Sequence, residues 1–142
     1  MNEQDITPAA QKILAVDDNR VILNVLTVML RSSGYKPLTA ISGSEAFAII
    51  HKEKPDLILL DLAFPPDEAD LASPMQDGFF IIQWLHRTEE TKNIPIIIIS
   101  GTDPAKYRER AMAAGAKACL QKPLRKEDVL PAIEKVLGGK PS

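Results

Sequence analysis

The sequence predicts a three-layer α/β/α fold around a parallel sheet, and two features of the chain lead to this prediction. Five short runs of apolar and β-branched residues alternate with five segments in which apolar residues recur at helical spacing. Two of these runs, at 57–60 and 96–99, are apolar at every position, which is typical of strands buried on both faces. Strands that alternate with helices pair in parallel through right-handed crossovers, so helices should cover both faces of the sheet.

The expected elements follow one another in strict alternation along the chain. We expect strands at Lys12–Asp17, Tyr35–Ala40, Asp56–Asp61, Pro95–Ser100 and Lys117–Gln121. We expect helices at Arg20–Ser32, Ser44–Glu53, Phe79–Arg87, Ala105–Ala114 and Lys126–Leu137. Pro131 is the one discordant residue, because it falls inside the last helical segment and removes a backbone hydrogen bond there.

Residues near the ends of these segments agree with the assignment. Ser42 and Glu45 match a capping box, in which a hydroxyl and a carboxylate three residues apart each bind a backbone N–H of the first turn. Asp103-Pro104 predicts a capped helix start, with proline at the first helical position. Gly34 and Gly115 stand where the preceding helices should end in a left-handed residue.

Length and composition indicate one ordinary globular domain. The chain has 142 residues, of which 45% are apolar and 25% are charged. We expect a domain at 12–138, between a flexible lead-in at 1–11 and a flexible tail at 139–142. The formal net charge of −2 argues against direct binding to nucleic acid or another polyanion.

The chain carries no sign of export or of a membrane segment. Its longest apolar run, Ile94–Ile99, contains Pro95 and is too short to span a bilayer. The N-terminus is polar and acidic, unlike a secretory signal. The single cysteine, Cys119, cannot form an internal disulfide, so we expect a cytoplasmic protein in a reducing compartment.

Polar residues at the ends of the expected strands predict the functional site. They are two carboxylates after the first strand, one at the end of the third, a hydroxyl at the end of the fourth and an ammonium after the fifth: Asp17, Asp18, Asp61, Ser100 and Lys122. Because the carboxyl ends of parallel strands meet at one edge of the sheet, these groups should converge on one pocket. Taken singly, each aspartate has an alternative role as a helix N-cap, and the lysine as a solvated loop residue.

Carboxylates that converge in this way repel one another unless a cation neutralises them. A small set of oxygen ligands favours Mg²⁺, with Mn²⁺ as a substitute, over Zn²⁺ or Ca²⁺. The Ser100 hydroxyl and the Lys122 ammonium would then lie opposite the metal, where they could bind phosphoryl oxygens. A carboxylate nucleophile, a divalent cation and an ammonium together suffice to form an aspartyl phosphate.

Several short motifs occur in order between residues 12 and 138. They are Val16-Asp17-Asp18-Asn19, LILLDL at 57–62, Pro65, Asp77-Gly78, Ile99-Ser100-Gly101, AAGA at 113–116 and Lys122-Pro123. With these motifs the chain resembles a response regulator receiver domain, the phosphoacceptor module of two-component signalling. The resemblance implies a flavodoxin-like (βα)5 fold, a doubly wound parallel sheet with strand order 2-1-3-4-5.

The resemblance also implies a role for each matched polar residue. Asp61 would be the phosphorylated residue, Ser100 the hydroxyl that moves toward the phosphoryl group, and Lys122 the ammonium that pairs with it. The Lys122–Pro123 peptide bond is expected to be cis. The implied ligands of Mg²⁺ are three carboxylates and one backbone carbonyl: Asp17, Asp18, Asp61 and Ala63.

Two departures from the family pattern concern the fifth strand and one loop. The family usually carries Tyr or Phe where this chain has Cys119, which we interpret as a core thiol. Gly78 comes seventeen residues after Asp61, about nine more than is usual, which places an insertion within 66–76. Both a passive or disordered flap and a loop that selects partners or covers the site are open interpretations of this insertion.

A third departure lies on the third helix. Phe80 and Trp84 form an i, i+4 pair away from the expected core face of Ile81, Ile82 and Leu85. An exposed aromatic pair of this kind predicts an interaction surface. The inserted loop, a second copy of the chain in a dimer, or another partner could cover it.

These observations predict a phosphorylation-dependent signalling module, not an enzyme. Its expected partner is a histidine kinase or a histidine phosphotransfer protein, and phosphorylation would shift a two-state equilibrium. No output domain follows Leu137, which predicts a single-domain regulator or relay intermediate unless the chain is a piece of a longer protein. A degenerate receiver that binds partners without phosphorylation is the alternative. An aspartyl-phosphate phosphatase is disfavoured, because Ala63 stands where its general acid would be.

Overall fold

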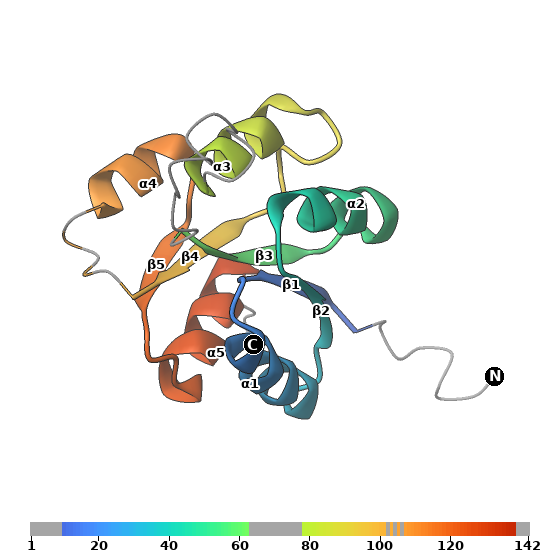
Figure 1. Ribbon diagram of the computed structural model, residues 1–142, viewed down its shortest axis with the longest axis vertical. Helices are drawn as coiled ribbons and strands as arrows, with labels where there is room; N and C mark the ends of the chain where they lie inside the picture. Colours follow the sequence, from blue (N-terminus) through green and yellow to red (C-terminus); the bar gives the residue numbers. More distant parts are fainter. Residues whose placement is uncertain (1–9, 63–77, 102, 104, 106, 139–142) are drawn as a thin grey trace.

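The computed structural model describes residues 10–62, 78–101, 103, 105 and 107–138, which form a five-stranded sheet between two layers of helices (Figure 1). The strands are β1 (Lys12–Val16), β2 (Lys36–Ala40), β3 (Leu57–Asp61), β4 (Ile96–Ser100) and β5 (Ala118–Gln121). The helices are α1 (Arg20–Ser32), α2 (Gly43–Glu53), α3 (Gly78–Arg87), α4 (Arg108–Ala114) and α5 (Lys126–Val136). The strand order is β2-β1-β3-β4-β5 and every neighbouring pair is parallel, so the predicted doubly wound fold is confirmed.

The helices divide between the two faces of the sheet. α1 and α5 cover one face, and α2, α3 and α4 cover the other (Figure 1). Along β3, Leu57 and Leu59 pack toward α1 and α5, whereas Ile58 and Leu60 pack toward the opposite layer. Successive side chains of a strand point to opposite faces, so a strand covered on both sides is apolar at every position. This explains the unbroken apolar runs of β3 and β4.

Most of the predicted helix boundaries are confirmed. The Ser42 hydroxyl accepts the Glu45 N–H at 3.2 Å at the start of α2. The Glu45 carboxylate accepts the N–H of Ile41 at 2.8 Å, one residue before the cap, so the capping box is slightly displaced. Gly34 and Gly115 both have positive φ, +92° and +117°, as predicted for residues that follow helix ends.

The start of α4 differs from the prediction. α4 begins at Arg108, not at Ala105, and its N-cap residue Tyr107 makes no side-chain capping hydrogen bond. Asp103 does bind a backbone N–H, that of Ala105 at 3.0 Å. Ala105 has 3-10 helical geometry, and an N-cap side chain accepts the N–H two or three residues further on, so Asp103 caps as predicted. The difference is that regular α-helix begins three residues later, at Arg108.

The last helix, α5, contains the proline that the helical pattern had left discordant. α5 continues through Pro131, as the helical pattern predicted. Val129 and Ile133 of α5 are fully buried against the sheet, and this packing holds the helix together across the proline. Among the described residues, no helix is both long enough and apolar enough to cross a bilayer.

Candidate functional site

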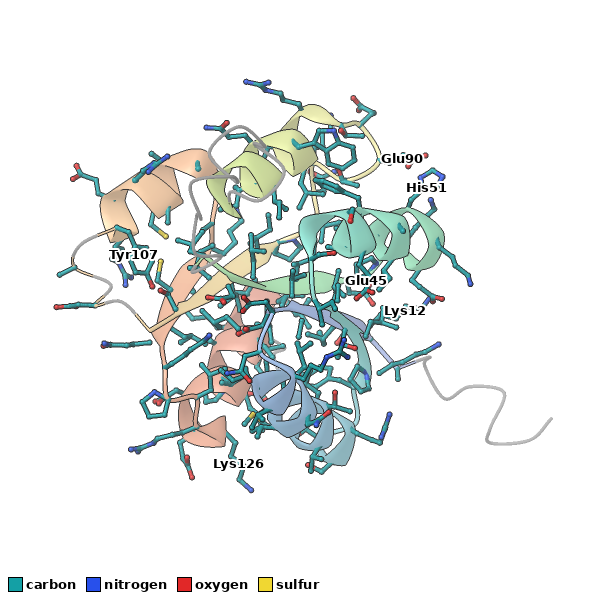
Figure 2. All side chains as sticks on the ribbon, viewed as in Figure 1. Lys12, Glu45, His51, Glu90, Tyr107 and Lys126 are labelled. Carbon is teal, nitrogen blue, oxygen red and sulfur yellow. The ribbon has the colours of Figure 1, made fainter. Side chains whose placement is uncertain are left out.

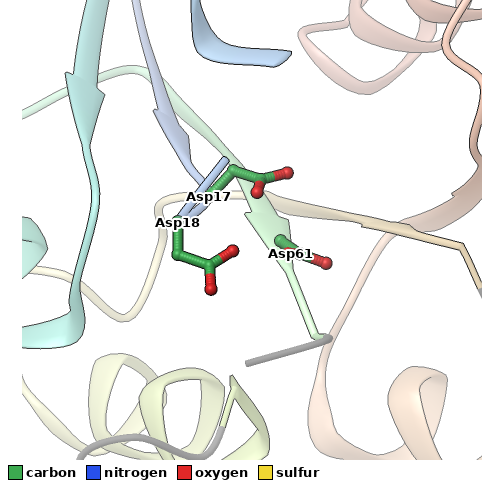
Figure 3. A group of neighbouring side chains, drawn as sticks. All are labelled: Asp17, Asp18 and Asp61. Atoms are coloured by element: carbon green, nitrogen blue, oxygen red, sulfur yellow. The ribbon is translucent and has the colours of Figure 1, made fainter. Parts of the chain in front are cut away.

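The predicted acidic residues meet at the carboxyl edge of the sheet. One oxygen from each of Asp17, Asp18 and Asp61 lies within 4.8 Å of the other two (Figure 3). The register explains this, because Val16 of β1 pairs with Leu60 of β3 and the residue that follows each is an aspartate. Asp17 and Asp61 are 0% and 1% exposed, whereas Asp18 is exposed to solvent. The pocket therefore has two buried carboxylates and one that reaches water.

Asn19 explains why the two aspartates after β1 do not cap α1. Asn19 Oδ1 accepts the N–H of Val21 at 2.9 Å and that of Ile22 at 3.3 Å, and so caps the helix. The alternative in which Asp17 or Asp18 caps this helix is therefore wrong. The sequence held the signal for this role, since Asn is a preferred cap and stands directly before the first helical residue.

Lys122 supplies the positive charge of the pocket. Its Nζ lies 2.8 Å from Asp17 Oδ2 and 3.5 Å from Asp61 Oδ2, and its side chain is 18% exposed. Burial lowers the pKa of Lys122, but the hydrogen bond to Asp17 and the charges of both aspartates outweigh burial, so the pKa lies above its usual 10.5. The alternative of a solvated loop lysine is therefore wrong.

Ser100 lies at the end of β4, beside Lys122. The Lys122 N–H donates to the Ser100 carbonyl at 2.8 Å, which continues the pairing of β4 and β5 up to the pocket. The Ser100 side chain is buried. The peptide bond between Lys122 and Pro123 is cis.

The charged groups that the described residues bring to the pocket do not balance. Among these residues, the three clustered carboxylates share the Lys122 ammonium, an excess of two formal negative charges around two side chains that water does not reach. A divalent cation would remove this excess. The donors are all oxygen, and the exposed Asp18 leaves one side open to water, as Mg²⁺ prefers. The residues present therefore fit a magnesium ion; the fourth expected ligand, Ala63, lies outside the described residues.

Tyr107 reaches the same edge of the sheet from the start of α4, and no sequence prediction had placed it there. Its ring packs against the core cluster that includes Ile96 and Ile98 of β4. Burial raises the pKa of Tyr107, and the nearby charge of Asp61 raises it further. The sequence held a signal for the burial of Tyr107. It stands four residues before the buried Ala111, so the two residues lie on the same face of a helix.

Cys119 lies on β5, opposite Ile98 of β4. It is half-buried and packs against the same core cluster as Tyr107. Burial raises the pKa of the Cys119 thiol, although the charge of Arg108 lowers it in part. A raised pKa keeps the thiol protonated, which supports the interpretation of Cys119 as a core residue.

Trp84 lies on α3, away from the pocket. Its side chain is 37% exposed, and its ring centroid is 4.5 Å from that of Phe47 on α2, with the planes tilted by 55°. α2 thus covers part of Trp84, an arrangement that the sequence prediction had not included. The Phe80 side chain and the insertion at 66–76 lie outside the described residues. The predicted core face of α3 is buried and therefore confirmed: Ile81, Ile82 and Leu85.

Comparison with known proteins points to a single family. Residues 13–134 match the family model described as response regulator receiver domain. Protein PilH of Pseudomonas aeruginosa is 33% identical to this chain over 128 residues, which cover 90% of this chain and 98% of PilH.

Solved structures agree with this match. The chemotaxis response regulator CheY4 of Vibrio cholerae superposes with a TM-score of 0.75 at 30% identity, over 89% of this chain and 98% of CheY4. The receiver domain of a sensor histidine kinase from Pseudomonas aeruginosa, solved with a magnesium ion coordinated in its active-site cleft, gives 0.76 at 27% identity, over 92% and 100% of the two chains. The fold, the acidic pocket and these matches agree, and the chain belongs to the response regulator receiver domain family of two-component signalling.

Proposed function

We propose that this chain accepts a phosphoryl group on Asp61 in a Mg²⁺-dependent reaction and thereby switches its binding to other proteins. Receiver domains are signalling modules that histidine kinases or histidine phosphotransfer proteins phosphorylate, and they bind Mg²⁺ at an acidic pocket. The observation that carries the proposal for this chain is the convergence of three carboxylates and the Lys122 ammonium at one edge of the sheet.

In the proposed reaction, a carboxylate oxygen of Asp61 attacks the phosphorus of a phosphohistidine partner. The P–N bond breaks as the P–O bond forms, and the imidazole leaves with the electron pair and takes up a proton. Lys122 Nζ lies 3.5 Å from Asp61 Oδ2, where it would offset negative charge on the transferred group. The Ser100 hydroxyl, at the end of the neighbouring strand β4, would donate to a phosphoryl oxygen.

Three aspartates and the Ala63 backbone carbonyl are the proposed ligands of Mg²⁺. Asp17 already accepts the Asn19 N–H at 2.9 Å through one oxygen and contacts Lys122 at 2.8 Å through the other. These contacts support an indirect role for Asp17, through a water on the metal, and a direct role for Asp18. When bound, the cation would neutralise charge on the phosphoryl oxygens.

The proposal is tested by the intact mass of the protein after incubation with Mg²⁺ and acetyl phosphate. Asp61→Asn is the test variant, and Asp56→Asn is the matched control, because Asp56 precedes the opposite end of β3 and its Oδ2 accepts the Lys12 N–H at 2.8 Å. We expect the native protein and Asp56→Asn to gain one phosphoryl group. Asp61→Asn should gain none, and a chelator should abolish the gain.

A folded native protein that gains no phosphoryl group would contradict the proposal unless it released phosphate from acetyl phosphate. Release that depends on Asp61 would show that the phosphoryl group forms and is rapidly hydrolysed. The absence of both gain and release would favour the alternative, an interaction module that does not need phosphorylation. Transfer from a phosphorylated histidine kinase or phosphotransfer protein, followed by the same mass measurement, tests the class of partner.

A further inference from the structure

Helix α1 presents a stripe of exposed valines on its outer face. Val21, Val25 and Val28 are 69%, 48% and 68% exposed, and they are three of the five large apolar side chains that are exposed in the described part of the chain. Figure 2 shows α1 at the outside of the molecule, across the sheet from His51 of α2. At about 100° per residue, the valines point away from the leucines of the same helix, which are buried against the sheet: Leu23, Leu26 and Leu30.

The spacing of this valine stripe is that of a contact between two helices. Single exposed apolar residues are ordinary in folded proteins. Residues four and then three positions apart, however, lie in one row along a helix, and such a row packs against the row of another helix that runs nearly parallel or antiparallel to it. The valine stripe is therefore one half of a helix–helix contact, and the described residues of this chain do not cover it.

The polar residues around the stripe fit a second copy of the same helix. α1 has no charged side chain between Arg20 and Arg31, which stand near its two ends. Two copies that meet along the stripe therefore bring no like charges together at its centre. Asn24, exposed beside Val25, carries an amide that both donates and accepts hydrogen bonds, so it can pair with the Asn24 of the second copy.

The two ends of the stripe differ in charge. The first turn of α1 adjoins the acidic pocket, where Asp18 is exposed and the described residues leave an excess of two negative charges, of which Arg20 offsets one. The last turn carries the exposed Arg31. In an antiparallel pair with a two-fold axis, each end of one helix meets the opposite end of the other. Asp18 lies seven residues before Val25 and Arg31 six residues after it, so an axis at Val25 brings these two opposite charges to the same level.

We propose that α1 is a self-association surface, on which two copies of this chain pair antiparallel about a two-fold axis at Val25. The valines of the two copies pack against each other, and each Arg31 lies beside the Asp18 of the other copy. Three partly exposed valines make a patch of a few hundred Å², less than the roughly 800 Å² per partner of a stable complex. The dimer is therefore weak and reversible, with a Kd of about 0.1–1 mM.

The first test measures the oligomeric state of the full chain by sedimentation equilibrium between about 0.01 and 1 mM, a range that covers this affinity. The native protein should dimerise as its concentration rises. Val25→Glu should raise the Kd at least about 10-fold, because two carboxylates then meet at the axis. The helix should stay folded, because Val25 is exposed and Glu is a good helix former.

Met112→Glu is the matched control, because Met112 is 39% exposed on α4 and the change of charge is the same. It should dimerise as the native protein does. A native protein that stays monomeric up to about 1 mM would overturn the proposal and would leave the valine stripe to a different protein. Equal loss of the dimer in Val25→Glu and Met112→Glu would also overturn it.

A second test asks whether the two copies of Val25 face each other. Val25→Lys alone should be as monomeric as Val25→Glu, because two ammonium groups then meet at the axis. A mixture of the two variants should form a heterodimer at least about 10-fold tighter than either homodimer, because opposite charges meet there. A mixture that associates no better than its components would overturn the proposal, since only a contact between the two copies of this residue predicts the rescue.

A third comparison tests the antiparallel arrangement. Arg31→Gln should raise the Kd about 2- to 5-fold, the effect of an ion pair at the edge of a contact. Arg87→Gln is its control, because Arg87 is also an exposed arginine in the last turn of a helix, α3, and the change in net charge is equal. It should leave the Kd unchanged. Equal effects of the two substitutions would overturn the pairing of Arg31 with Asp18.

Discussion

The two ends of β1 carry similar charged groups in very different surroundings. At its amino end, Asp56 Oδ2 accepts the backbone N–H of Lys12 at 2.8 Å, and Lys12 Nζ lies 3.3 Å from Glu53 Oε1. The two side chains of this ion pair are 34% and 28% exposed. After its carboxyl end, Lys122 Nζ lies 2.8 Å from Asp17 Oδ2, and the two side chains are 18% and 0% exposed. The two ion pairs thus differ mainly in their access to water.

This difference shows which end of the strand serves stability and which serves a ligand. Water screens an ion pair at the amino end, so the pair is worth little to folding. At the carboxyl end, Asp61 and Asp18 add two more carboxylates, more negative charge than the Lys122 ammonium alone can neutralise. Such an excess of buried like charge is unfavourable for folding. The carboxyl end therefore holds charges that become favourable when a cation and a phosphoryl group bind.

The largest expected effect compares the two lysines. Lys122→Met should lower the free energy of unfolding by about 3–5 kcal/mol without divalent cations, because it leaves the buried Asp17 carboxylate without its partner. Lys12→Met should lower it by about 0–1 kcal/mol, because its ion pair is only partly buried and water screens it. Urea unfolding at pH 7 measures both. Equal losses of unfolding free energy in the two variants would mean that water reaches the pocket. The two ion pairs would then not differ in burial.

A smaller effect separates the aspartates and responds to the cation. Without Mg²⁺, Asp18→Asn should stabilise the protein by about 1 kcal/mol, because it removes one repelling charge from the pocket. Asp56→Asn should destabilise it by about 1 kcal/mol, because a charged acceptor of the Lys12 N–H is replaced by a neutral one. Mg²⁺ at ten times its Kd should stabilise the native protein by about 1.4 kcal/mol. The measurement is urea unfolding with and without Mg²⁺.

Asp56→Asn is the control in that experiment and should keep the full stabilisation by Mg²⁺, whereas Asp18→Asn should lose most of it. If both variants responded to Mg²⁺ like the native protein, the exposed carboxylate would not be a ligand. If Asp18→Asn destabilised the protein without Mg²⁺, the three carboxylates would not repel one another as their distances indicate.

The location of the site could be predicted because it depends on a general property of parallel sheets. Residues that follow neighbouring parallel strands meet at one edge whatever the helices between them do. Val16 of β1 pairs with Leu60 of β3, and Asp17 and Asp61 are the residues that follow them. Their positions in the sequence therefore sufficed to predict that they lie together. The strands were predictable for a similar reason, since burial on both faces leaves an unbroken apolar run.

Other features could not be predicted because they depend on contacts between distant segments. The carboxylate of Asp103 indicated the cap on Ala105, but no local pattern indicated that regular α-helix begins only at Arg108. Tyr107 is partly buried because it packs against a core cluster that includes Ile96 and Ile98 of β4, nine or more residues earlier in the chain. Trp84 looked fully exposed because its partner Phe47 belongs to another helix. Local patterns do not carry such tertiary contacts.

The smallest expected effect is the dependence of stability on alkaline pH. The pKa of Lys122 is raised above 10.5 in the folded protein, so its contribution is fully present below 10.5 and is lost as the pH rises through the higher folded value. The raised pKa of Tyr107 acts in the same direction above its usual 10.0, because the folded state also favours the protonated phenol. The melting temperature should therefore fall more steeply above about pH 10 in the native protein than in Lys122→Met. Lys12→Met should keep the native fall of melting temperature with pH. If Lys122→Met also kept it, the charge of Lys122 would not be what holds Asp17 and Asp61 at this edge of the sheet.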